Sequence, residues 1–186
     1  MSNSTKALLG LLLAGSVGMV IFLFVHFTNN PNQPVSIGGK SANAGCANGA
    51  QDCLPDVSYV DTHGTTYSPK DLAGKVVMIN FWATWCPPCK KEIPDLSRAW
   101  EKYKDKGLVL LGVMMDDVDA NTLVNFQSDY EMLYPVVRGT REIDGAYGRP
   151  KNYPTTFIFD RTGRLVFSEP GGLSDRKLAQ ILEPLL

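Results

Sequence analysis

The segment Cys86-Pro87-Pro88-Cys89 constrains this chain more than any other, because an apolar run precedes it and a helix-like segment follows it. The run Val76–Trp82 predicts a buried strand, which places Cys86 at the N-terminus of the next helix. Unpaired backbone N–H groups and the helix dipole favour a thiolate there. The spacing therefore predicts a redox dithiol, with Cys86 as a partly exposed nucleophile and Cys89 as the thiol that resolves the mixed disulfide.

Two other interpretations of the same pair are a zinc site and a pair of inert core cysteines. A zinc site needs two further ligands, usually a second close pair. An electropositive helix N-terminus is a poor place for inert cysteines. The remaining cysteines are too widely spaced to form a typical ligand pair, and the chain has only two histidines, so the sequence favours the dithiol: Cys46, Cys53, His26 and His63.

Two stretches resemble the active-site segments of a known family. Asn80 to Pro94 and Tyr153 to Asp160 are similar to the TlpA/ResA-like group of membrane-anchored, extracytoplasmic thiol–disulfide oxidoreductases with a thioredoxin fold. The resemblance runs from about Val57 to Leu182. It implies a cis peptide bond before Pro154, where an isolated X-Pro bond would usually be trans. We expect neither a metal nor a cofactor, and a substrate-binding surface formed by Trp85, Pro87, Pro88, Tyr153, Pro154 and Thr155.

The chain departs from ordinary thioredoxins at Asn80, where those proteins carry a buried aspartate. An asparagine cannot transfer a proton at neutral pH. The TlpA/ResA-like group resembles this chain in carrying a glutamate at the position of Glu92, one helical turn after Cys89. If it is partly buried, Glu92 is a candidate acid/base for Cys89. The alternative is a solvated glutamate beside two lysines.

The N-terminal part of the chain predicts a membrane anchor. Residues 7–27 are uncharged and apolar, and as a helix they would span about 31 Å, close to the thickness of a bilayer core. Lys6 precedes the run and no Lys or Arg follows until Lys40, which favours a cytoplasmic N-terminus. The run is longer than the apolar region of a cleaved signal peptide, the competing interpretation. We therefore expect a cytoplasmic segment 1–6, an anchor 7–27, a linker 28–55 and a thioredoxin-like domain 56–186.

The domain itself alternates predicted strands and helices. This order predicts an α/β three-layer sandwich around a mixed sheet, with an N-terminal hairpin and a central strand–helix insert. Pro94 predicts a kink or break in the helix after the dithiol. The expected strands are 57–60, a segment around 66, 76–81, 108–114, 134–137, 155–159 and 164–167, and the expected helices are 87–104, 120–130, 143–147 and 174–182.

These features predict an extracytoplasmic enzyme that exchanges disulfides with protein substrates. The resemblance implies a reductant for apocytochrome c or a copper-site protein, itself re-reduced by a transmembrane donor of the DsbD/CcdA type. A disulfide-donating oxidase and a Cu(I)-binding metallochaperone remain alternatives. Cys46 and Cys53 can pair with each other or form a second redox pair. A formal net charge of −1 gives no electrostatic case for nucleic-acid binding.

Overall fold

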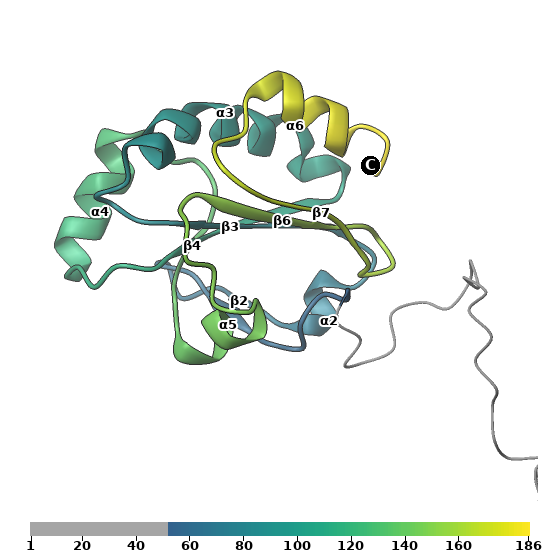
Figure 1. Ribbon diagram of the computed structural model, residues 1–186, viewed down its shortest axis with the longest axis horizontal. Helices are drawn as coiled ribbons and strands as arrows, with labels where there is room; N and C mark the ends of the chain where they lie inside the picture. Colours follow the sequence, from purple (N-terminus) through teal and green to yellow (C-terminus); the bar gives the residue numbers. More distant parts are fainter. Residues whose placement is uncertain (1–51) are drawn as a thin grey trace, which may run out of the picture. The chain divides into compact units, whose positions relative to one another are not determined.

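The computed structural model describes residues 52–186, which fold into three layers (Figure 1). The middle layer is a five-stranded sheet with the order β5-β4-β3-β6-β7. β3, β4 and β5 run parallel, whereas β6 is antiparallel to β3 and β7 is antiparallel to β6, so the predicted mixed sheet is confirmed. The bounds are β3 (Val76–Trp82), β4 (Leu108–Met114), β5 (Val136–Arg138), β6 (Thr155–Phe159) and β7 (Leu165–Pro170).

Both faces of the sheet are covered, as the burial of β3 shows. All of its residues are buried, and alternate side chains of a strand point to opposite faces. Met78 and Trp82 belong to one core cluster, and Ile79 and Phe81 to the other. In Figure 1, α3 (Pro87–Tyr103) and α6 (Asp175–Leu182) lie over one face. The opposite face carries the predicted N-terminal hairpin and two short helices, namely β1 (Tyr59–Val60), β2 (Thr66–Tyr67), α2 (Pro69–Leu72) and α5 (Arg141–Ala146).

Helix α3 begins directly after Cys86, which is its N-cap residue. Pro87 and Pro88 occupy the first positions, where the missing N–H groups have no helical partner to lose. The helix then continues through Pro94 to Tyr103, where a short 3₁₀ turn, η1 (Lys104–Lys106), follows. Of the predicted kink or break at Pro94, the break is therefore excluded, because the packed helix tolerates the one hydrogen bond that a proline removes, and the kink stays a prediction.

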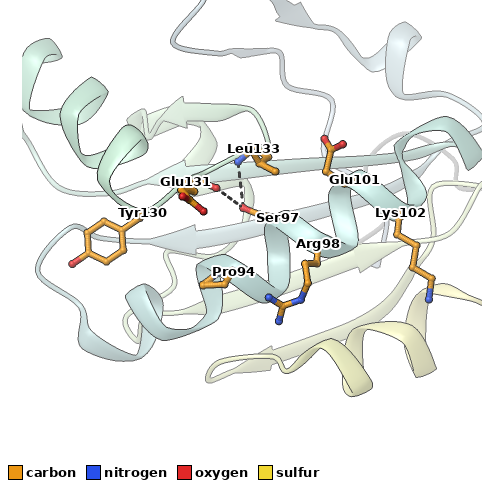
Figure 2. Close-up of a pocket in the computed structure, with 8 residues that line it drawn as sticks. All are labelled: Pro94, Ser97, Arg98, Glu101, Lys102, Tyr130, Glu131 and Leu133. Atoms are coloured by element: carbon orange, nitrogen blue, oxygen red, sulfur yellow. Dashed lines mark hydrogen bonds between the residues drawn. The ribbon is translucent and has the colours of Figure 1, made fainter.

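The predicted insert between β4 and β5 is present as α4 (Ala120–Asp129). Ser97 of α3 ties the segment after α4 to the core, as Figure 2 shows. Its Oγ donates to the Glu131 carbonyl at 3.1 Å and accepts from the Leu133 N–H at 3.2 Å. A concavity of about 590 Å³ opens beside this contact, lined by Pro94 and residues further along α3. None of its lining residues belongs to the dithiol.

The chain enters the domain along β7. Leu165 N–H donates to the Asp52 carbonyl at 2.7 Å, and Cys53 forms a bridge with Arg164. This contact lies beside the β6–β7 turn, where Phe159 pairs with Leu165, and hence at the end of β3 that is remote from Cys86. Within the described residues, Asp52 and Cys53 thus already contact the domain, a few residues before the expected boundary. Cys53 is disulfide-bonded, whereas the prediction for Cys46 lies outside the described residues.

The sequence missed α2 and placed the first strand too early. Ser68 caps α2 through a capping box with Asp71, a pattern that is readable in the sequence. The hairpin strands are shorter than expected, with β1 starting at Tyr59. Within residues 52–186, no helix is long and apolar enough to cross a membrane. The predicted anchor at residues 7–27 lies outside this range.

Candidate active site: a buried disulfide at a helix N-terminus

Cys86 and Cys89 form a disulfide with an S–S distance of 2.06 Å. Cys86 Sγ also accepts a hydrogen bond from the Cys89 backbone N–H at 3.2 Å, so this sulfur acts as the helix cap. The predicted partial exposure of Cys86 is wrong for this disulfide form, in which its exposed fraction is 2%. The bond to Cys89 and the N–H contact hold the sulfur over the first helical turn, inside the apolar cluster.

The two tryptophans beside the dithiol have different environments. Trp82 is 1% exposed and stacks on Phe126 of α4, with ring centroids 5.2 Å apart. Trp85 is 65% exposed, and its ring lies 6.1 Å from that of Tyr153. Trp82 therefore packs the core, whereas Trp85 contributes to the surface beside the dithiol.

The proline loop before β6 lies beside this surface. The Tyr153–Pro154 peptide bond is cis, as the resemblance implies. Pro154 is buried, and its carbonyl accepts from the Gly171 N–H at 2.7 Å, so this carbonyl is already paired within the domain. Thr155 Oγ1 donates to the Asn152 carbonyl at 2.6 Å and thereby fixes the loop. Tyr153, which is half-buried, carries the contact with Trp85.

Asp116 holds the loop that leads into the dithiol, a role that the sequence did not predict. Its carboxylate, just after β4, accepts the Thr84 N–H at 3.1 and 3.2 Å. The Thr84 hydroxyl donates to the same carboxylate. Parallel pairing of β3 with β4 brings the two loops to the same end of the sheet.

Glu92 is buried, with an exposed fraction of 3%. Its Oε1 accepts from Asn80 Nδ2 at 2.9 Å, and its Oε2 accepts from the Leu173 N–H at 3.0 Å. Burial raises the pKa of Glu92 to about 7; the two hydrogen bonds oppose this shift, and the nearby Asp95 adds to it. A carboxyl group with this pKa can both take and return a proton near neutral pH.

The part of the chain from 52 to 186 contains no group of three or more His, Cys, Asp or Glu side chains that is arranged to hold a metal ion.

Pro87 and Pro88 are exposed at the helix start, next to the disulfide. The geometry therefore supports reversible disulfide exchange at Cys86, with Cys89 as its partner.

Residues 50–168 match the AhpC/TSA family. The chain belongs to this family. Its sequence is 32% identical to the thiol-disulfide oxidoreductase ResA of Bacillus thuringiensis (strain Al Hakam) over 87% of this chain and 83% of that protein. It is 29% identical to the thioredoxin-like protein YneN of Bacillus subtilis, over 89% of this chain and 95% of that one.

Solved structures agree with this assignment. A thiol:disulfide interchange protein of the thioredoxin family from Chlorobium tepidum matches with a TM-score of 0.67 and 28% identity, over 75% of this chain and 99% of its own. The TlpA/ResA-like resemblance is thereby confirmed, and so is the thioredoxin-like fold. This AhpC/TSA-family member is a thiol–disulfide oxidoreductase with a Cys-Pro-Pro-Cys centre.

The raised pKa of Glu92 makes a prediction about stability. The pKa is 4.5 in an unfolded chain and about 7 in the folded one, so the folded protein binds more protons between these values. The contribution of Glu92 to the free energy of unfolding is then fully present below pH 4.5 and falls by about 3 kcal/mol as the pH rises through 7. Glu92→Gln should abolish this fall, measured by urea unfolding of the oxidised protein from pH 4.5 to 8.

Glu101→Gln is the matched control, because Glu101 is an exposed carboxylate on the same helix. This variant should keep the pH dependence of the natural chain. An equal fall in Glu92→Gln and in the natural protein would show that Glu92 is not the group responsible.

Proposed function

We propose that the protein is an extracytoplasmic reductant of protein disulfides, anchored by residues 7–27. Its substrates would be disulfides of apocytochrome c or of a copper-site protein, and a transmembrane thiol donor of the DsbD/CcdA type would re-reduce it. The apolar segment with Lys6 before it supports the location. The likeness to proteins named ResA supports the class of reaction.

The observation that carries the reducing direction is the pair of prolines in the first turn of α3. A thiolate at a helix N-terminus is stabilised by the free N–H groups of that turn. Pro87 and Pro88 have none, whereas Cys89 donates its N–H to Cys86 Sγ. A dithiol is a strong oxidant when its reduced form is well stabilised. Loss of two donors therefore favours a low reduction potential.

The proposed reaction uses the two sulfurs and Glu92, which follows Cys89 by one helical turn. The Cys86 thiolate attacks one sulfur of a substrate disulfide; the new bond joins it to that sulfur, and the other substrate sulfur leaves and takes up a proton. Glu92 then accepts the proton of Cys89, since Cys89 is 1% exposed and has little access to water. Cys89 attacks Cys86 Sγ, the protein disulfide forms, and the second substrate thiol is released, so two electrons pass to the substrate.

The test is the reduction potential of the Cys86–Cys89 pair in the full chain, equilibrated in thiol redox buffers. Mass spectrometry of alkylated peptides reads this pair separately from the other two cysteines. We expect a value at or below about −270 mV, the potential of thioredoxin. A value near −120 mV, that of a strong disulfide donor, would overturn the reducing direction.

A double variant tests the physical cause. Pro87→Ala with Pro88→Ala restores both N–H groups at the helix start. Because a hydrogen bond to a charged group contributes about 1.5–3 kcal/mol, the potential should rise by about 30 mV or more. An unchanged potential would show that the prolines do not set it.

A further inference from the structure

Asn80 lies at the centre of the hydrogen bonds that hold Glu92. We infer that Asn80 is a positioning residue: it fixes the orientation of the buried Glu92 carboxyl, which follows Cys89 by one turn of α3. This inference rests on the acid/base role of Glu92 in the proposed function, and it assigns the residue that supports that role.

The geometry is a three-way contact in the core. Asn80 is 1% exposed, and its Nδ2 donates to Glu92 Oε1 at 2.9 Å and to Thr156 Oγ1 at 3.1 Å. The second carboxyl oxygen of Glu92 is held by the Leu173 N–H, from the loop between β7 and α6. The carboxyl group is thus fixed from β3 on one side and from this loop on the other, while Thr156 fixes Asn80 against β6.

The neutral amide suits both protonation states of Glu92. With Glu92 ionised, the amide must present its N–H group, as the structure shows. With Glu92 protonated, a rotated amide would present its carbonyl oxygen to the carboxylic O–H. Asn80 Oδ1 has no hydrogen-bond partner within the described residues. The rotation therefore breaks only the two hydrogen bonds that Nδ2 donates. An aspartate here would instead place two carboxylates in contact.

Other groups also face Glu92 from the surrounding elements. Asp95 lies in the next part of α3, and Tyr134, which is buried before β5, interacts electrostatically with the Glu92 carboxyl. Lys91 lines the same groove of about 320 Å³ as Glu92. Gly172 lies over the carboxyl, since a Cβ at this position would be 3.6 Å from Oε2. The groove offers the Glu92 proton a route to water. Among these neighbours, Asn80 is the one whose side chain donates a hydrogen bond to the Glu92 carboxyl.

Loss of the Asn80 contact should raise the pKa of Glu92. The Asn80 N–H stabilises the ionised form of Glu92 and so lowers its pKa. Asn80→Ala removes this bond, and the pKa should rise by about one pH unit. Asn80→Asp should raise it further, because a second carboxylate next to Glu92 opposes ionisation. If Glu92 is the base for Cys89, the rate of disulfide exchange at pH 6 should fall about tenfold in Asn80→Ala.

The experiment uses the full chain with ¹³C-labelled glutamate and follows the Glu92 carboxyl by NMR during a pH titration. Single-turnover reduction of a glutathionylated peptide is measured over the same pH range. Thr156→Val is the matched control, because it removes the other partner of Asn80 and leaves the bond to Glu92. We expect its Glu92 titration to stay in place, while both Asn80 variants shift upward.

An unshifted Glu92 titration in Asn80→Ala and Asn80→Asp would overturn the inference. Should the alanine variant not fold, the aspartate variant, which has nearly the same size, decides. A shifted titration with an unshifted rate profile would support Asn80 as the positioning residue and overturn the base role of Glu92 instead. The potential measured for the natural protein is independent of both results.

Discussion

Cys86→Ser should reduce disulfide exchange to the uncatalysed rate while leaving the fold intact. Serine is among the preferred N-cap residues, so its hydroxyl can accept the Cys89 N–H in place of the sulfur. The variant loses the nucleophile and keeps the cap, which separates chemistry from stability. Turnover of a protein disulfide and the thermal midpoint of the reduced protein are the two measurements.

Cys89→Ser is the matched control and should fail at a different step. Cys86 can still attack, but the mixed disulfide has no resolving thiol and should accumulate as a covalent complex on non-reducing gels. Trapping by Cys86→Ser, or equal turnover in the two variants, would contradict the assigned order of attack.

Trp82→Ala should destabilise the folded protein by about 3–5 kcal/mol, since it removes a large buried side chain. Trp82 is almost fully enclosed and stacks on Phe126, so its loss also loosens α4 on the sheet. Urea unfolding with the disulfide intact measures the change. The expected shift is a large fraction of the stability of an ordinary domain.

Trp85→Ala is the control at the neighbouring tryptophan. Because Trp85 is largely exposed, its removal should change the free energy of unfolding by less than about 0.5 kcal/mol. It should instead raise the KM for a protein disulfide, through loss of surface contact near Cys86. Similar destabilisation by both alanine variants would contradict the division between packing and surface.

The sequence predicted the sheet and its covering helices because their signals are local and strong. The apolar run of β3 and the helix start at Cys86 each determine structure within a few residues. The short elements were harder to place. The hairpin strands β1 and β2 have almost no periodicity, and α2 depends on its capping box.

The site was predictable where the chemistry lies in one motif, and unpredictable where it depends on contacts across the fold. Cys86, Cys89 and Glu92 lie in one segment of sequence. The hydrogen bonds that define the state of Glu92 come from Asn80 and Leu173, and the loop clamp comes from Asp116. Neither contact has a sequence signature, because both depend on how distant elements pack.

The burial of Cys86 was mispredicted for a related reason. A helix N-terminus is usually accessible, and the sequence alone gives no measure of how closely the apolar cluster surrounds the first turn. In the disulfide form the sulfur bonded to Cys89 lies within that cluster.

The contact of Asp52 with the domain lies beside the β6–β7 turn, far from the dithiol. The dithiol lies at the opposite end of β3, a strand that rises about 23 Å along its length. Immobilising the domain on a bead or an electrode through a residue of the β6–β7 turn, beside Asp52, would therefore leave the Cys86 end directed toward the solution. A partner protein could approach Trp85 without meeting the support, which makes this domain suitable for surface-based measurements of substrate capture.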